Sequence, residues 1–364
     1  MRKYLLPCLL LFCTVACNAR PIKFNGDTLE LNKDFKRTQC GTLDIKKNIK
    51  EVSGIACSRV TPGYIWMQSD DYESFIVATD EKGEERFAKI SFTRSIRWDW
   101  EDMSGGIYDG KNYLFIGAFG DNEETDGNYH IVYFEEPAID PANPNISITP
   151  GDIKFVYPDG KKHNAEALMY DNREQMIYVI TKVYYNVCQV FSLPFRLDYG
   201  DSEQTLTYIC DLGVRSDLGD GAKPFKGFHL VTAADISPDG KYILIKNHNN
   251  ISASFSWILM WTRQKGESVA ETLQRQLYPE NIACYQYEWQ GEAMCWLDNS
   301  TFYTTSDADD GNPPIYKYVR EMPDATEMVT DDRTNTTAKL EIIGDILYIR
   351  SPQGLFTIDG RKVQ

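Results

Sequence analysis

Histidine, basic charge and long apolar runs are scarce in this sequence, and each scarcity excludes a class of function. The 364 residues include only 4 histidines, which argues against a zinc site or a histidine-based catalytic triad. The formal net charge of −15 provides no basic surface for a nucleic acid. No stretch after the N-terminus approaches 18 apolar residues, so we expect no membrane-spanning helix.

The nine cysteines also lack an informative motif. None of those beyond the N-terminal segment has CxxC spacing, so the sequence predicts neither a thiolate metal site nor a thioredoxin-like redox motif. Cys188 and Cys210 flank the Tyr199-Gly200 turn signal symmetrically, and would face each other across a hairpin there. A disulfide between them and two buried thiols remain alternatives.

The first 17 residues have the pattern of an export signal. A basic start, Met1-Arg2-Lys3, precedes an apolar stretch over residues 4–12 that is too short to span a bilayer. Thr14-Val15-Ala16-Cys17 resembles a bacterial lipobox, which implies that Cys17 is lipidated and anchors the exported chain in the cell envelope, on the periplasmic side or at the cell surface. The alternative is an ordinary signal peptide that is cleaved nearby. Residues 18–35 are polar and predict a tether.

An acid followed by small and apolar residues recurs along the chain, at Glu51, Glu101, Glu166, Asp235 and Glu292. A loose repeat of about 50–70 residues built from β-type segments is typical of propeller blades. Alternating apolar residues and Gly/Pro turns predict four strands in each blade. We therefore predict an all-β β-propeller over residues 36–330. Five blades are readable, and we expect six, with the sixth built from residues 42–45 and the C-terminal strands.

Two segments depart from the blade pattern. Residues 265–278 have a composition compatible with a helix. Residues 331–364 read as a polar linker and a β tail, with strands expected at residues 346–350 and 355–358. The tail resembles the C-terminal sorting tails of exported Bacteroidetes proteins that use the type IX secretion system. The alternative is that these strands close the propeller ring.

The repeated acids have a geometric consequence. The first two strands of a blade are antiparallel, so the start of one and the end of the other lie on the same face of the propeller. The candidate metal ligands on this face are Glu51, Glu101, Asp121, Glu166, Asp235 and Glu292. The candidate ligand-binding residues are Asp70, Lys182, Lys246, Asn247 and Asp307.

Carboxylates that are crowded in this way raise one another's pKa values unless something compensates. A divalent cation on the propeller axis is one solution, and Ca²⁺ fits best because it accepts six to eight oxygen ligands in irregular geometry. Pairing with Lys182 and Lys246 is the second solution. Hydrogen bonds from backbone N–H groups are the third, purely structural one. The sequence leaves all three open.

Several ordered motifs resemble a broad group of exported bacterial propellers, related to the phytase-like esterase domain and the SdiA-regulated propellers. These motifs include Glu51-Val-Ser-Gly-Ile, Asp99-Trp-Glu-Asp, Gly120-Asp-Asn, Glu166-Ala-Leu and Thr232-Ala-Ala-Asp. The resemblance covers about residues 48–310 and implies the propeller fold, whereas it identifies no catalytic residue. A fold alone does not supply a function.

Two functions follow as hypotheses. The first is a monomeric, lipid-anchored propeller that binds a small molecule, a glycan or an envelope protein at the acidic face, through Ca²⁺. The second is a Ca²⁺-dependent hydrolase of phosphate or carboxylic esters, in which the metal polarises the scissile group and the two lysines stabilise the developing charge.

Overall fold

The computed structural model describes residues 22–24, 27–29, 31–71, 74–96, 99–183, 187–212, 230–249, 252–276, 279–307, 311–321, 339–343, 346–351 and 354–357. The expected lipidation site, Cys17, lies outside these residues. The chain divides into a larger unit, residues 1–32 with 37–318, and a smaller unit, residues 33–36 with 319–364. Within the described residues, no helix has both the length and the apolar character needed to cross a membrane.

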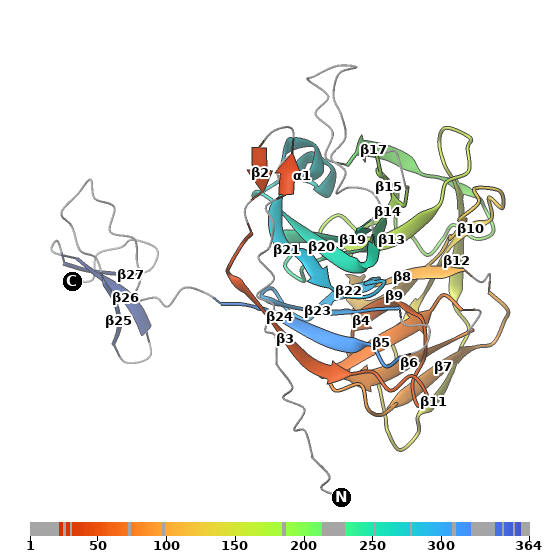
Figure 1. The fold of residues 1–364 in the computed structure, drawn as a ribbon, viewed down its shortest axis with the longest axis horizontal. Coiled ribbons are helices and arrows are strands. Elements are labelled where there is room, and N and C mark those ends of the chain that lie inside the picture. Colours follow the sequence, from red (N-terminus) through yellow and green to blue (C-terminus); the bar gives the residue numbers. More distant parts are fainter. Residues whose placement is uncertain are drawn as a thin grey trace, which may run out of the picture. The chain divides into compact units, whose positions relative to one another are not determined.

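Five sheets form the blades of a β-propeller (Figure 1). The first blade consists of β4 (Val52–Cys57), β5 (Tyr64–Ser69), β6 (Phe75–Asp80) and β7 (Ala88–Phe92), with β11 (Asn145–Ile148) added at its outer edge. The second blade consists of β8 (Trp100–Tyr108), β9 (Lys111–Ala118), β10 (Tyr129–Glu135) and β12 (Gly151–Val156), with β16 (Gln204–Thr205) at its outer edge. The strands of these two blades are antiparallel, except for β11 and β16, which each join the edge of a blade in parallel.

The other three blades have four strands each. The third consists of β13 (Ala165–Asp171), β14 (Met176–Thr181), β15 (Gln189–Pro194) and β17 (Thr207–Asp211). The fourth consists of β18 (Val231–Ile236), β19 (Tyr242–Asn249), β20 (Ser252–Thr262) and β21 (Glu280–Tyr287). The fifth consists of β22 (Ala293–Trp296), β23 (Thr301–Thr305), β24 (Pro314–Arg320) and β3 (Phe35–Thr42).

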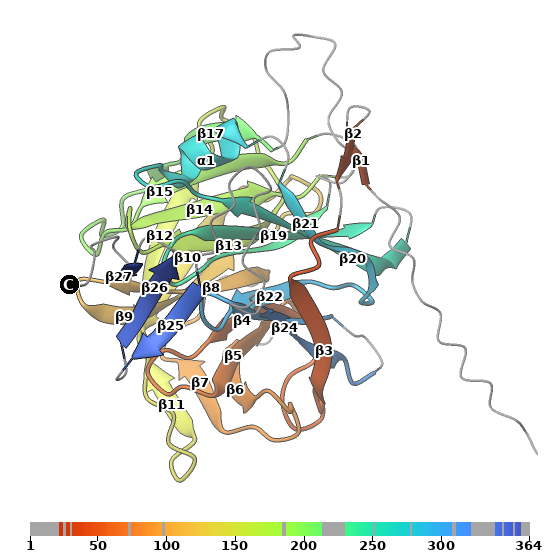
Figure 2. The same ribbon diagram turned by 90° about the vertical axis from the view of Figure 1, so that its left-hand side faces the viewer.

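The first strands of successive blades contact one another around the whole ring: β4 with β8, β8 with β13, β13 with β18, β18 with β22, and β22 with β4. These inner strands are almost fully buried because blades pack against both of their faces. Figure 2 shows the same blades after a turn of 90° about the vertical axis.

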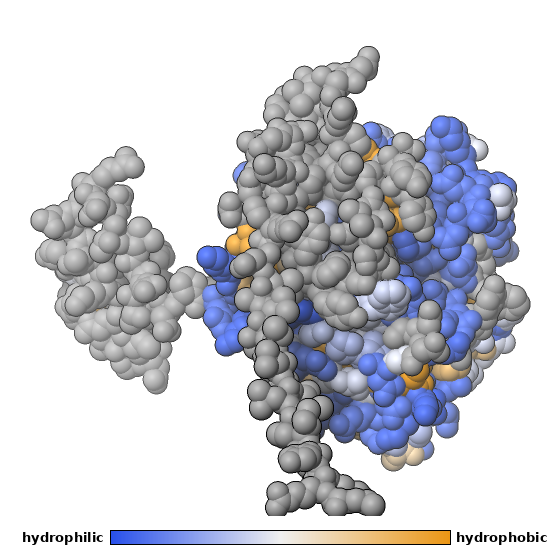
Figure 3. Space-filling view, viewed as in Figure 1, coloured by the Kyte–Doolittle hydropathy of each residue, from blue (hydrophilic) through white to orange (hydrophobic). Residues whose placement is uncertain are grey.

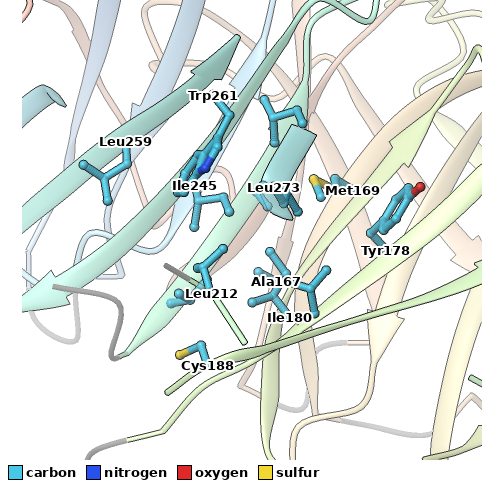
Figure 4. Close-up of a cluster of buried hydrophobic side chains, with 14 of the residues drawn as sticks. Ala167, Met169, Tyr178, Ile180, Cys188, Leu212, Ile245, Leu259, Trp261 and Leu273 are labelled. Atoms are coloured by element: carbon cyan, nitrogen blue, oxygen red, sulfur yellow. The ribbon is translucent and has the colours of Figure 1, made fainter. Parts of the chain in front are cut away.

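The hydrophobic core lies between neighbouring blades. Figure 4 shows the cluster between the third and fourth blades, where Ala167 and Ile180 face Ile245, Leu259 and Trp261. Comparable clusters fill the spaces between the first and second, second and third, and fifth and first blades. By contrast, the surface of the described residues in Figure 3 is mostly hydrophilic, in keeping with the net negative charge.

The short helix α1 (Val269–Arg275) falls within the segment of helix-compatible composition. Ser268 caps it and forms a capping box with Glu271, so that orphan N–H groups of the first turn are satisfied. Val269 and Leu273 are buried and join the core between the third and fourth blades. The helix therefore covers the outside of the propeller at that point.

The propeller prediction is confirmed, and the number of blades is five. The sixth blade that we expected from residues 42–45 and the C-terminal strands is not formed among the described residues, because β3 is the outer strand of the fifth blade. The C-terminal strands β25 (Lys339–Ile343), β26 (Ile346–Ser351) and β27 (Gly354–Thr357) form a separate antiparallel sheet in the smaller unit.

Two further expectations concern the N-terminal segment and the cysteines. In the expected tether, β1 (Ile22–Phe24) and β2 (Asp27–Leu29) form a short hairpin. Cys188 and Cys210 are both free thiols. Their strands pair with Cys210 opposite Val190, two positions away from Cys188, so the two thiols do not face each other. Cys188 is buried and Cys210 is partly buried, so the alternative of two buried thiols is met at Cys188 and only in part at Cys210.

Candidate functional site

An acidic cavity of about 920 Å³ opens where the first strands begin and the second strands end. Among the described residues that line it, eleven are acidic and Lys182 is the single basic one. The acidic residues are Glu51, Asp70, Asp71, Asp99, Glu101, Asp121, Glu123, Asp126, Glu166, Glu292 and Asp307. Gly120, Asn122, Thr125 and Gln290 complete the lining.

Eight of the eleven residues that we predicted from the sequence line this cavity. They are Glu51, Asp70, Glu101, Asp121, Glu166, Lys182, Glu292 and Asp307. Asp235, Lys246 and Asn247 are not among its lining residues. Asp99 and Gly120 also line the cavity and were not predicted, although both belong to the motifs quoted above.

Irregular strand starts help to aim the acids into the cavity. Glu166 is the extra residue of a β-bulge, because Ala165 pairs with Thr181 and Ala167 pairs with the preceding Ile180. A bulge of this kind re-aims a side chain. Glu51 immediately precedes β4 and has a φ of 51°, an uncommon backbone conformation for a residue with a side chain.

Lys182 lies among the carboxylates at the cavity wall. Its ammonium group pairs with Glu166 Oε2 and lies 3.9 Å from Glu292 Oε1. Burial lowers the pKa of Lys182, but the carboxylates of Glu166 and Glu292 outweigh this effect and raise it. The lysine therefore stays charged and compensates part of the negative charge.

The remaining acids are not fully compensated. Burial, together with the nearby carboxylates of Glu292 and Asp307, raises the pKa of Asp70 to about 8. Burial and the carboxylates of Glu166 and Asp99 raise the pKa of Glu101 well above its usual range, against the opposing effect of Lys182. At neutral pH the cavity therefore holds protons on some of its carboxyl groups.

Glu101 is 4% exposed and lies beside Gly120. It forms no hydrogen bond or ion pair within the described part of the chain. A side chain at position 120 would overlap Glu101 Oε1, and its Cβ would lie 2.7 Å from Asp99 Oδ2. The glycine thus leaves room for two carboxyl groups to converge on the same point of the wall.

Asp121 has a structural role in addition to its place in the wall. It accepts hydrogen bonds from the N–H groups of Thr125, Asp126 and Gly127 and from the hydroxyl of Tyr129. Burial raises the pKa of Asp121, but these hydrogen bonds outweigh burial and lower it. Asp121 is therefore ionised and fixes the loop at the cavity mouth.

Asp235 lies deeper than the sequence repeat implied. In both β13 and β18 a bulge follows the first paired residue, which is Ala165 in β13 and Val231 in β18. The bulged residues, Glu166 and Thr232, therefore occupy equivalent positions. Asp235 lies three positions after Thr232 along β18. Its Oδ2 accepts the Trp296 N–H at 2.8 Å, and its Oδ1 accepts the Ile236 N–H at 2.9 Å. Asp235 is thus not the equivalent of Glu166.

Asp102 plays a similar part and was not predicted. Its Oδ2 accepts the N–H groups of Leu168 at 2.9 Å and Ala234 at 3.1 Å, and its Oδ1 accepts the Met103 N–H at 2.8 Å. These donors belong to the second, third and fourth blades. Asp102 and Asp235 therefore join the inner strands, which is the structural alternative that the sequence left open.

Lys246 is likewise internal. It is fully buried and its Nζ lies 2.5 Å from Glu288 Oε2, while Thr304 donates a hydrogen bond to the other oxygen of Glu288. Burial lowers the pKa of Lys246, and Glu288 opposes this. Asn247 is buried next to it, opposite Val231. Lys246 thus ties the fourth blade to the fifth.

The oxygen-rich wall has the donor chemistry that suits Ca²⁺. In the described residues, however, no three His, Cys, Asp or Glu side chains lie close enough together to hold a metal ion as they stand. Between Glu166 and Glu292, the positive charge is that of Lys182. A metal ion would therefore have to draw other carboxylates of the wall together.

Comparisons with known proteins found, among others, two solved structures of low similarity. No protein-family model matches the chain, and no curated protein sequence matches it. The PQQ-bound aldose sugar dehydrogenase of Streptomyces coelicolor is similar with a TM-score of 0.39 and 7% identity, over 80% of this chain and 99% of that one. The hydrazine synthase of Kuenenia stuttgartiensis has a TM-score of 0.36 and 9% identity, over 74% and 96%. At these scores the likeness says nothing about what the cavity binds.

Proposed function

We propose that this protein is an exported, lipid-anchored β-propeller that binds a ligand or an envelope protein at the acidic cavity through Ca²⁺. One observation carries the proposal: within the part of the chain that the structure describes, eleven carboxyl side chains and a single lysine line one cavity. Such a wall attracts cations. Burial first, and then the neighbouring carboxylates, raise the pKa of Asp70, and a bound cation would neutralise the charge of those carboxylates.

The residues that would hold the ion are Glu51, Asp70 and Glu292, because the carboxylates of Glu292 and Glu51 both act on Asp70 and all three residues line the same cavity. Lys182 would keep Glu166 neutralised at the side of the site. A bound Ca²⁺ supplies open coordination positions, to which carboxylate or hydroxyl oxygens of a glycan or protein ligand attach.

The test is a Ca²⁺ titration of the full chain at pH 7, followed by calorimetry and by thermal melting. We expect Ca²⁺ at about 100 times its Kd to stabilise the native state by about 2.7 kcal/mol, and excess EDTA to reverse the effect. The Asp70→Asn variant should lose the response. Glu135→Gln, an exposed acid that pairs with Lys111 away from the cavity, should retain it. Absence of heat and of a melting shift up to millimolar Ca²⁺ would refute the metal-dependent proposal.

A second candidate function is hydrolysis of phosphate or carboxylic esters, as the resemblance to phytase-like esterase propellers implies. The observation that favours it is Glu101, a buried acid with a raised pKa that lines the cavity together with Lys182. A protonated Glu101 would act as a general acid, and Lys182 would stabilise negative charge. Chromogenic phosphate and acyl esters test this candidate: turnover that is lost in Glu101→Gln supports it, and absence of turnover with Ca²⁺ present refutes it.

Export and lipidation are part of the proposal and have their own test. Incorporation of a labelled fatty acid into the full chain, and its loss in Cys17→Ala, would support lipidation. A labelled product from both chains would place the lipid elsewhere, and no label in either would refute the anchor.

A further inference from the structure

Two buried thiols meet where the ring closes. Cys57 is the last residue of β4 in the first blade, and Cys295 lies in β22 of the fifth blade. Their sulfur atoms are 3.3 Å apart, and the residues are 7% and 2% exposed. Both belong to the hydrophobic cluster between these two blades, together with Ile55 and Ala293.

We propose that Cys57 and Cys295 form a disulfide bond that covalently closes the propeller between its first and last blades. The sulfurs of a disulfide are about 2.05 Å apart, so an approach of about 1.3 Å completes the bond. Cys188 and Cys210 show the contrast, because the strand register sets them two positions apart. The proposal concerns a covalent cross-link and is independent of what the cavity binds.

The reaction needs an oxidant, and a low-molecular-weight or protein disulfide supplies it. One cysteine thiolate attacks that disulfide, forms a mixed disulfide and releases one thiolate of the oxidant. The second cysteine then attacks the protein sulfur of the mixed disulfide and releases the other thiolate. In sum, the two protein thiols lose two electrons and two protons, and the oxidant is reduced to two thiols.

Burial sets when the reaction occurs. Burial and the contact with Cys57 raise the pKa of the Cys295 thiol, so little thiolate is present in the folded state. Exchange is therefore slow once the fifth blade has packed against the first. The bond forms while these blades come together, and burial afterwards protects it from reductants.

The position of the bond gives it a large effect on stability. The two cysteines are 238 positions apart, so the bond closes a loop that contains most of the propeller. A loop of this length removes much of the conformational entropy of the unfolded chain. The fifth blade, which contains Cys295, already takes its outer strand β3 from the N-terminal part of the chain, and this closure of the ring depends on hydrogen bonds. The disulfide would make this closure covalent.

The test is peptide mapping of the full chain, synthesised in a cell-free system with either oxidised glutathione or dithiothreitol and then alkylated without reduction. We expect the oxidised sample to contain a peptide pair joined through Cys57 and Cys295, two hydrogens lighter than the sum of its parts. The oxidised protein should melt about 5–9 °C above the reduced protein. Adding oxidised glutathione only after folding should form the bond at least tenfold more slowly.

Two variants control the melting difference. Cys57→Ser should abolish it, whereas Cys188→Ser, a buried cysteine between other blades, should retain it. Alkylation of both Cys57 and Cys295 in the protein made with oxidised glutathione would overturn the proposal, even if every variant failed to fold. Pairing of either residue with Cys284 or with an N-terminal cysteine would overturn it equally.

Discussion

Removal of the Asp102 carboxylate is the sharpest test of how the ring is held together. In Asp102→Ala, the N–H groups of Leu168 and Ala234 lose their acceptor in a region with no access to water. A buried donor left unsatisfied costs about 1–3 kcal/mol, so these two donors predict a loss of about 2–6 kcal/mol in the free energy of unfolding. Both donors lie in other blades, so the loss weakens contacts between blades.

Burial of the Asp102 charge acts in the opposite direction and raises the pKa of this carboxyl group. Replacement of buried charges by other groups is sometimes neutral or stabilising. Asp102→Asn separates the two effects, because it removes the charge and keeps one oxygen for Leu168 and Ala234. If the hydrogen bonds dominate, Asp102→Asn should fall between the wild type and Asp102→Ala.

The assay is denaturation by guanidinium, followed through tryptophan fluorescence, since Trp66 and Trp100 are buried in the core between the first two blades. Asp201→Ala, an exposed turn acid, is the matched control and should change stability by less than about 0.5 kcal/mol. A value for Asp102→Ala within about 1 kcal/mol of the wild type, or a more stable Asp102→Asn, would refute the reasoning.

Three further predictions concern the cavity. The pKa of Asp70 is raised to about 8 in the folded state, so its contribution to stability is present at acidic pH and is lost as the pH rises through 8. Melting between pH 5 and 9 without Ca²⁺ should show the free energy of unfolding decline by up to about 1.4 kcal/mol per pH unit, and by less in Asp70→Asn. An equal slope in both proteins would contradict this. Lys182→Met leaves Glu166 without its cation and should lower the free energy of unfolding by about 3–5 kcal/mol, and added Ca²⁺ should restore part of it. A denaturation midpoint like that of the wild type would count against the ion pair. Gly120→Ala should push the Glu101 carboxyl group out of place and, as an overpacked site, lower stability by about 1–3 kcal/mol in guanidinium denaturation. An unchanged midpoint would show that the wall has room for a side chain there.

Much of the fold was predictable because blade repeats leave regular marks in a sequence. The inner and second strands carry near-continuous apolar runs between turn residues, since blades cover both of their faces. The outer strand β3 was not predictable in this way: its sequence FKRTQCGT is mostly exposed or half-buried and has no apolar alternation. This is why β3 was not predicted as the outer strand of the fifth blade, and why residues 42–45 were assigned to a sixth.

The charged residues of the cavity wall were predictable from strand direction alone, as Glu166 and Lys182 illustrate. Their depth in the ring was not predictable. A bulge, or a shift of a few positions along the strand, decides whether a carboxyl group reaches the cavity or the interior. Asp235 reads like Glu166 in the sequence and lies three positions further in. The paired acids Glu101 and Asp102 were the missed signal: neighbouring strand residues point in different directions, so only one of the two could belong to the wall.

The two groups of acids differ in what the protein gains from them. The oxygens of Asp102 and Asp235 are used by N–H groups of several blades, so these carboxylates hold the ring together. Burial raises the pKa values of all four acids. Backbone N–H groups oppose this rise at Asp102 and Asp235, whereas neighbouring carboxylates add to it at Asp70 and Glu101, so the ionised forms of the wall acids repel one another and destabilise the fold. A fold that keeps destabilising groups together at one cavity does so for a reason other than stability. The wall acids, and not the interior ones, are therefore where a bound cation has its largest effect.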